Sequence, residues 1–121
     1  MATILVIDDD ELVLEAVRIV LEGDEHTVST AMDGIEGMRL VNQHPYDLVI
    51  TDLIMPNKEG MGVLIDIKQS FPSLKVIVIS GGGRISPESY LGDAKTLGAD
   101  GTLAKPFSYR DLIACVDQAL N

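Results

Sequence analysis

Four apolar runs of the sequence are each followed directly by side chains that could do chemistry. Asp8 and Asp9 follow the first run, Asp52 the second, Ser80 the third and Lys105 the last. If these runs are parallel strands, their carboxyl ends meet at one edge of a sheet, where the functional groups of such folds gather. We therefore expect the three carboxylates, the hydroxyl and the ammonium to lie together.

Three converging carboxylates require a compensating positive charge. Two carboxylates about 4 Å apart repel each other by roughly 4 kcal/mol at an effective dielectric constant of about 20. Such a cluster binds a cation, or one of its members takes up a proton. Mg²⁺ is the expected ion because it prefers oxygen ligands, keeps several water molecules and needs only a few carboxylates. The sequence thus predicts a magnesium site at Asp8, Asp9 and Asp52.

A carboxylate beside Mg²⁺ and a lysine can also act as a nucleophile. Asp52 would attack a phosphoryl group and form an acyl phosphate, while Mg²⁺ and Lys105 offset the charge on the transferring oxygens. Ser80 would donate a hydrogen bond to a phosphoryl oxygen. Each residue alone also has an ordinary interpretation, as a helix cap, a loop hydroxyl or a solvated lysine, and we expect Asp10 to be such a cap. The combination carries the prediction.

Five short apolar runs alternate with longer amphipathic segments. Residues 4–7, 48–50 and 76–79 are rich in β-branched side chains, which is typical of strands buried on both faces of a parallel sheet. Residues 26–31 alternate and fit an edge strand, and residues 101–104 fit a weaker final strand. Right-handed crossovers and short connections then favour an open, doubly wound α/β sheet built from five strand–helix units.

Capping residues mark the starts of several helices. Asp33 with Glu36 marks one start, and Pro87 has the position of a first helical residue. Ser108 with Asp111 marks the start of the last helix.

The apolar residues of two helices predict which faces are buried. Residues 60–70 should form a helix that ends before Pro72. Leu64 and Ile65 should face the core, with Met61 as a further candidate. For the first helix, we expect one apolar stripe made by Leu12, Ala16, Ile19 and Val20.

Length and composition limit the remaining options. The chain has 121 residues, the size of one ordinary domain, so we expect residues 1–121 to form a single domain with no output domain after the last helix. A net charge of −10 disfavours direct nucleic-acid binding, which depends on basic surface. No apolar run approaches the ~20 residues of a membrane span, and the N-terminus lacks a secretory signal. We therefore expect a cytoplasmic protein.

The cysteine and the histidines are not expected to do chemistry. Cys115 is the single cysteine, cannot form an intramolecular disulfide, and should pack as a small apolar side chain. His26 begins a predicted strand and His44 lies in a loop, so we expect structural or surface roles for both.

The chain resembles the response-regulator receiver domains of the CheY-like superfamily over residues 3–120. The matching motifs are Asp8-Asp9 after the first strand, residues 47–56 ending in Met55-Pro56, residues 78–81 around Ser80, and residues 97–107 ending in Lys105-Pro106-Phe107. Asp-x-x-Met-Pro together with Lys-Pro-Phe in register is a highly specific combination. The resemblance implies a flavodoxin-like (βα)5 sheet with strand order 2-1-3-4-5, which agrees with the reading of the elements above.

The resemblance also implies roles for the residues at the strand ends. Asp52 would be the phosphoacceptor and, with Asp9, a direct Mg²⁺ ligand. Asp8 would act through water, and the backbone carbonyl of Ile54 would complete the protein ligands.

Three further residues have roles by the same resemblance. Ser80 would be the switch hydroxyl, and Lys105 would pair with the phosphoryl group. Pro106 would follow a cis peptide bond that helps to aim the lysine.

The implied function is a two-component signalling switch. It would receive phosphate from a sensor histidine kinase or a histidine phosphotransfer protein and catalyse only its own phosphorylation and dephosphorylation. Output would occur by protein contact through the face of the fourth helix, fifth strand and fifth helix, which is also a frequent homodimer contact in the family.

Two other function classes remain open. Asp8-Asp9-Asp10 has the Asp-x-Asp spacing of haloacid-dehalogenase-type phosphohydrolases, although the Gly-Thr flap of that family is missing. A receiver-shaped adaptor that works without phosphate is the other alternative.

One departure from the family pattern is Thr102, where members often have an aromatic ring or histidine. That ring commonly changes rotamer when the switch hydroxyl engages phosphate, and Thr102 cannot make the same swing. The usual coupling is therefore in doubt, and this keeps the adaptor alternative open.

A second departure is the glycine run Gly81-Gly82-Gly83 after the switch serine. Glycine enlarges the accessible backbone space, and we expect phosphate to order this segment. Ile54 and Gly82 also stand where the family often has polar side chains near the phosphoryl group. Neither can position a hydrolytic water through a side chain, so we predict a long-lived acyl phosphate.

Overall fold

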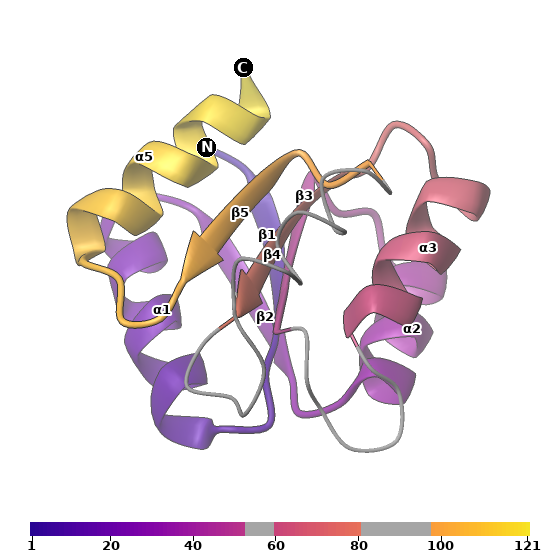
Figure 1. The fold of residues 1–121 in the computed structure, drawn as a ribbon, viewed down its shortest axis with the longest axis horizontal. Coiled ribbons are helices and arrows are strands. Elements are labelled where there is room, and N and C mark those ends of the chain that lie inside the picture. The colour runs from indigo at the N-terminus through magenta and orange to yellow at the C-terminus, as the bar shows by residue number, and fades with distance from the viewer. Residues whose placement is uncertain (53–59, 81–97) are drawn as a thin grey trace.

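The computed structural model describes residues 1–52, 60–80 and 98–121, and only the backbone of Gly60 and Met61. In this part of the chain, five parallel strands form one sheet with helices on both faces (Figure 1). The strands are β1 (Thr3–Ile7), β2 (Thr27–Ala31), β3 (Leu48–Asp52), β4 (Lys75–Ser80) and β5 (Gly101–Ala104). The helices are α1 (Glu11–Gly23), α2 (Gly34–Gln43), α3 (Gly60–Ser70) and α5 (Tyr109–Leu120).

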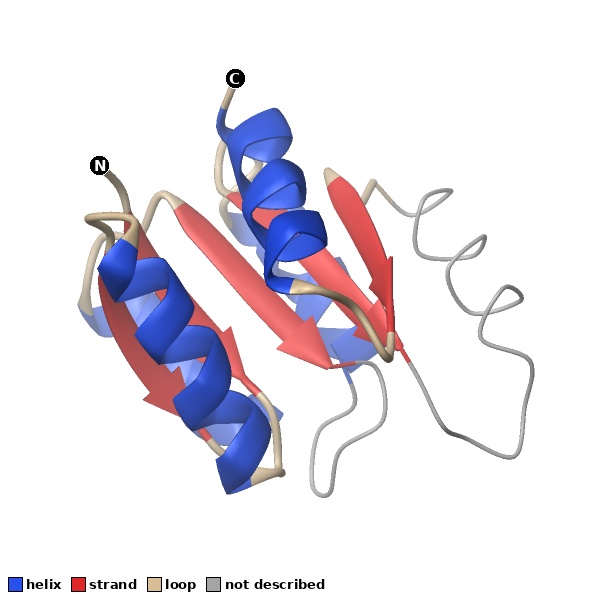
Figure 2. Cartoon of the chain, turned by 90° about the vertical axis from the view of Figure 1, so that its left-hand side faces the viewer, coloured by secondary structure: helices blue, strands red, loops and turns tan. Residues whose placement is uncertain are grey.

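The predicted α/β topology is confirmed. The strands lie in the order β2-β1-β3-β4-β5, and Figure 2 shows that they all run in the same direction. Their carboxyl ends therefore share one edge of the sheet. The helix predicted to begin at Pro87 lies outside the described residues. None of the described helices has the length and apolar character needed to span a bilayer.

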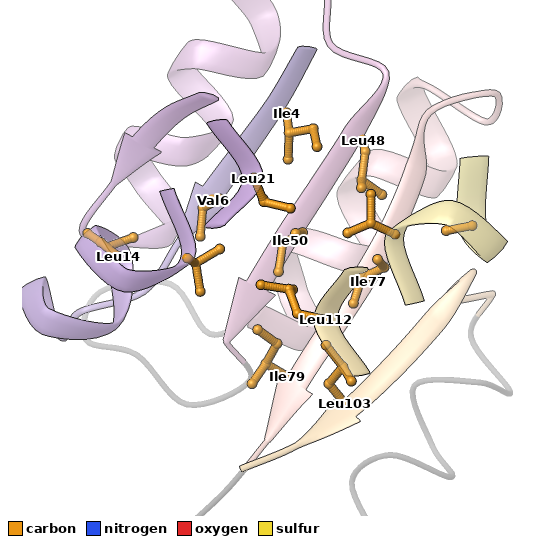
Figure 3. Packing of buried hydrophobic residues seen from close by; sticks show 13 residues of the cluster. Ile4, Val6, Leu14, Leu21, Leu48, Ile50, Ile77, Ile79, Leu103 and Leu112 are labelled. Atoms are coloured by element: carbon orange, nitrogen blue, oxygen red, sulfur yellow. The ribbon is translucent and has the colours of Figure 1, made fainter. Parts of the chain in front are cut away.

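Two apolar cores cover the sheet. Helices α1 and α5 lie on one face and α2 and α3 on the other (Figure 1). In β1, Ile4 and Val6 point to the α1–α5 side, whereas Leu5 and Ile7 point to the α2–α3 side. Figure 3 shows the α1–α5 cluster, in which Leu112 of α5 packs with the strand side chains. Burial on both faces explains why these strands are almost continuously apolar.

The predicted stripe of α1 is wrong except for Val20, which is partly buried against the α1–α5 cluster. Leu12 is 82% exposed and Ile19 is 59% exposed. The helix instead buries Leu14, Val17 and Leu21. Both sets of residues have helical spacing, so periodicity did not fix the rotation of the helix. Packing against the sheet fixed the rotation of α1, because it buries the apolar face that contains Leu14, Val17 and Leu21.

Helix α3 has the predicted bounds, but its inward face is only partly the predicted one. Leu64 is buried, as predicted, whereas Ile65 is exposed. Val63 and Ile67 complete the buried face. The side chain of Met61 lies outside the described part.

The caps of α2 and α5 agree with the sequence analysis. The Asp33 side chain accepts a hydrogen bond of 2.8 Å from the Glu36 N–H. Ser108 and Asp111 form a reciprocal capping box. Cys115 of α5 is half-buried and packs against the α1–α5 cluster, and this burial raises the pKa of its thiol.

Candidate functional site

Asp8 directly follows β1, and Asp52 is the last residue of the neighbouring strand β3. Strands β1 and β3 pair in parallel, with Ile7 opposite Thr51, so the next residue of each strand lies at the same edge of the sheet. Asp8 is 1% exposed and Asp52 is 9% exposed. One carboxylate oxygen from each of Asp8, Asp9 and Asp52 lies within 4.8 Å of the others. The structure therefore brings together the three carboxylates that the sequence singled out.

Lys105 reaches into this carboxylate cluster from the end of β5. Its Nζ atom donates a hydrogen bond of 3.2 Å to Asp8 Oδ2 and lies 3.6 Å from Asp52 Oδ2. Partial burial alone would lower the pKa of the Lys105 ammonium, but the charges of Asp52 and Asp8 outweigh this effect and raise the pKa. The lysine is therefore held in its charged form beside the carboxylate expected to react.

Backbone geometry fixes the position of Lys105. Its N–H donates a hydrogen bond of 2.7 Å to the carbonyl oxygen of Ser80, so β4 and β5 remain joined at the site. The peptide bond between Lys105 and Pro106 is cis, as the family resemblance implied.

Both carboxylate oxygens of Asp8 accept hydrogen bonds. Oδ1 accepts a hydrogen bond of 2.9 Å from the Asp10 N–H, and Oδ2 accepts the bond from Lys105. Burial raises the pKa of the Asp8 carboxyl, although both of these partners act in the opposite direction. Asp10 itself caps α1, because its Oδ1 accepts a hydrogen bond of 3.0 Å from the Leu12 N–H. Asp10 therefore has the capping role predicted for it.

The described donors fit a hard divalent cation. All three side chains offer carboxylate oxygens, which are the ligands that Mg²⁺ prefers. When ionised, three carboxylates and the Lys105 ammonium leave a net charge of −2, which one divalent ion would neutralise. Asp9 is exposed at the rim and Asp52 is buried, so an ion between them would remain open to water on one side.

Ser80 and Thr102 occupy the strands on the Lys105 side of the site. Ser80 ends β4, the strand between β3 and β5, and its side chain is buried. Thr102 lies in β5 opposite Val78 and is half-buried. The remaining predicted site residues, Ile54, Gly81, Gly82 and Gly83, lie outside the described part of the chain.

An apolar groove next to Lys105 was missed by the sequence analysis. It encloses about 430 Å³ between α1 and the segment that leads into α5. Val13 and Val17 line it from α1, and Phe107 and Leu112 line it from the other side. The spacing of Val13 and Val17 was the available signal, but the wrong rotation assigned to α1 concealed it.

Together, a 2-1-3-4-5 parallel sheet and an acidic cluster with a lysine at its carboxyl edge define an α/β domain of the receiver class. Residues 4–117 match the family model of the response regulator receiver domain. This chain therefore belongs to the response regulator receiver domain family, as the sequence motifs predicted.

Curated relatives support the same assignment. Response regulator GtcR of Aneurinibacillus migulanus is 32% identical over 118 residues, which cover 98% of this chain and 47% of that protein. Transcriptional regulatory protein GlrR of Escherichia coli (strain K12) is 34% identical over 119 residues, covering 98% of this chain and 26% of that protein. This chain thus spans about half the length of the first relative and about a quarter of the second.

Solved structures agree in fold over the whole chain. A response regulator receiver domain protein from Clostridium thermocellum has a TM-score of 0.91 and 36% identity, covering 100% of this chain and 95% of that one. Chemotaxis protein CheY4 of Vibrio cholerae has a TM-score of 0.87 and 26% identity, covering 99% of both chains.

Proposed function

We propose that this protein is a phosphorylation switch of a two-component system, with Asp52 as the phosphoacceptor. The observation that carries the proposal is the position of the Asp52 carboxylate. It lies 3.6 Å from the Lys105 ammonium and close enough to Asp8 and Asp9 to share one ion with them. The phosphodonor would be the phosphohistidine of a sensor histidine kinase or of a histidine phosphotransfer protein.

In the proposed reaction, one oxygen of Asp52 attacks phosphorus in line with the phosphorus–nitrogen bond of the donor. That bond breaks as the new phosphorus–oxygen bond forms, and the imidazole leaves with the electron pair. Bound Mg²⁺, held by Asp9, Asp52 and a water on Asp8, would supply charge neutralisation for the phosphoryl oxygens. Lys105 would exchange its carboxylate contact for a phosphoryl oxygen, and Ser80 would donate a hydrogen bond to another. Catalysis would be limited to this phosphorylation and its reversal by water.

The donor needs a surface on which to dock, and the apolar groove between α1 and α5 offers one. It ends at Lys105, so a partner helix seated there would bring its histidine to the mouth of the site. Leu12 lies outside this groove, beside Asp9 and Met32 at the start of α1, and is 82% exposed. In the proposed complex, the partner contact extends from the groove across the start of α1 to Leu12. We place these contacts in the cytoplasm, where phosphodonors are made from ATP.

Output would also occur by protein contact, through the face expected for the fourth helix, β5 and α5. The segment of the fourth helix lies outside the described residues. We also propose that two copies of the chain form a homodimer through this face.

Acetyl phosphate with Mg²⁺, followed by intact mass measurement, tests the phosphoacceptor. The wild-type chain should gain one phosphoryl group, and Asp52→Asn should gain none. Asp10→Asn is the matched control, because asparagine also caps helices and Asp10 is not a proposed ligand. This control should be labelled to the same extent as the wild type, while labelling of Asp52→Asn would overturn the assignment.

The same variants separate the alternatives. A haloacid-dehalogenase-type hydrolase would use Asp8 and Asp10, so Asp10→Asn would abolish turnover of small phosphate esters. The structure instead shows the Asp10 carboxylate engaged in capping α1. A phosphate-independent adaptor would keep its output in Asp52→Asn.

A further inference from the structure

A second group of metal-ligating side chains lies at the opposite end of the sheet from Asp52. Asp24 follows α1, His26 precedes β2, and Asp117 belongs to the last turns of α5. One nitrogen of His26 and one carboxylate oxygen of each aspartate all lie within 4.8 Å of one another. Both chain ends are at this end of the sheet (Figures 1 and 2).

His26 supplies an independent indication of a ligand, because its side chain is buried and incompletely satisfied. The residue is 8% exposed, and its Nδ1 accepts a hydrogen bond of 3.0 Å from the Ala2 N–H. Its Nε2 atom is also buried and has no hydrogen-bond partner among the described residues. Nε2 faces Asp24 Oδ2 at 3.5 Å. Buried polar atoms are nearly always paired, so this atom requires an explanation.

We propose that Asp24, His26 and Asp117 form a site for Zn²⁺ or a similar borderline transition-metal ion. The donors are one imidazole and two carboxylates, a set that suits Zn²⁺, whereas Mg²⁺ prefers oxygen ligands alone. Three protein ligands and one water would give the usual four-coordinate zinc geometry. The site is therefore chemically distinct from the all-oxygen cluster around Asp52.

The distances fit such an ion. Tetrahedral bonds of about 2.1 Å place neighbouring ligand atoms about 3.4 Å apart. The separation of 3.5 Å between His26 Nε2 and Asp24 Oδ2 has this value. Asp24 and Asp117 are both exposed, so rotation of their side chains can close the remaining gap. An ion there would join the end of α1, the start of β2 and α5.

Metal binding has a signature at the N-terminus. Because Nδ1 accepts the Ala2 N–H, the ring hydrogen of the metal-free imidazole is assigned to Nε2. Binding through Nε2 moves that hydrogen to Nδ1, and the Ala2 N–H loses its acceptor. Leaving this N–H without its acceptor lowers the affinity for metal by roughly five- to a hundredfold. The change at the Ala2 amide can be measured by a method that does not depend on phosphorylation.

The test is a Zn²⁺ titration of the full chain in excess Mg²⁺, followed by nuclear magnetic resonance of the imidazole groups. The chain has two histidines, and the exposed His44 serves as an internal control. The His26 signals should shift saturably at one equivalent, with transfer of the ring hydrogen to Nδ1 and faster exchange at the Ala2 amide. The signals of His44 should not shift in the same range.

Variants then identify the carboxylate ligands. Asp24→Asn and Asp117→Asn should each weaken Zn²⁺ binding about tenfold or more. Glu25→Gln removes an equal charge from the exposed residue between two proposed ligands and should leave the affinity within about twofold of the wild type. Unchanged His26 signals would overturn the proposal, as would wild-type affinity in both aspartate variants or an equal loss in Glu25→Gln. Asp52→Asn should bind Zn²⁺ normally, so this proposal and the proposed phosphorylation fail separately.

Discussion

The Nζ atom of Lys105 lies 3.6 Å from Oδ2 of Asp52, although Lys105 follows β5 and Asp52 ends β3, and these strands are not adjacent. Strand β4 separates β3 from β5, and the Lys105 side chain crosses this strand to reach the cluster. It also donates a hydrogen bond to Asp8. One ammonium thus balances two buried carboxylates, and the predictions for the site follow from that balance.

Replacing Lys105 by methionine should have opposite effects on metal binding and on phosphorylation. Without the ammonium, the carboxylate cluster is more negative, so Mg²⁺ should bind several-fold more tightly. Phosphorylation by acetyl phosphate should be slower by about 10² or more, because the positive charge that faces the transferring oxygens is gone. Calorimetric Mg²⁺ titration and timed mass measurement check the two effects. Weaker Mg²⁺ binding in Lys105→Met would contradict this balance of charges.

The stability of the metal-free protein should fall as the pH rises through the titration of Asp8. Burial raises the pKa of this carboxyl above its ordinary value of 3.8, so the folded chain holds the proton more tightly than the unfolded chain. The stabilisation that this difference provides is therefore fully present below pH 3.8, the ordinary pKa, and is lost as the pH rises through the folded-state pKa. Urea unfolding at a series of pH values measures this loss, and saturating Mg²⁺ should reduce it.

The variant Asp8→Asn isolates this effect. It should be more stable than the metal-free wild type at neutral pH, by on the order of 1 kcal/mol. It should also lose most of the stabilisation that Mg²⁺ gives to the wild type. A metal-free Asp8→Asn protein that unfolds at a lower urea concentration than the wild type at neutral pH would show that the Lys105 contact outweighs burial.

Leu12 should matter for a protein phosphodonor but not for a small one. If a partner helix docks in the groove beside Lys105 and also covers the start of α1, Leu12→Ser should slow transfer from a phosphotransfer protein by about tenfold. Transfer from acetyl phosphate should be unchanged, because that donor needs no docking surface. Ile19→Ser is the matched control, since Ile19 is a second exposed apolar residue of α1. Equal slowing by both variants would argue against a specific contact at Leu12.

Gly101→Ala should destabilise the fold at the strand that carries Lys105. A Cβ atom at this position would lie 2.9 Å from Cys115 Sγ and 3.2 Å from Ile77 Cγ1. Such overpacking costs about 1–3 kcal/mol, which urea unfolding would detect. Adding Cys115→Ala removes the sulfur and should recover part of the loss, so the double variant should be more stable than the sum of the single changes predicts.

The sequence by itself determined the strands and the chemical set at their carboxyl ends, and its resemblance to receiver domains implied the strand order. Every residue in a run such as 48–50 is apolar, so both faces of the strand are apolar. This pattern can be recognised from the run itself, without knowledge of the rest of the fold. Asp8 and Lys105 each directly follow a strand and Asp52 ends one, so the parallel arrangement brings them to one edge.

Only the tertiary structure decided how the helices turn and which distant residues meet. Leu12 and Leu14 both belong to sets with helical spacing, and packing on the sheet buried the second. The meeting of His26 with Asp117 likewise depends on how α5 lies over the sheet. The physical reason is that local patterns fix the type of each element, whereas its rotation and its neighbours depend on the apolar area that the assembled fold can bury.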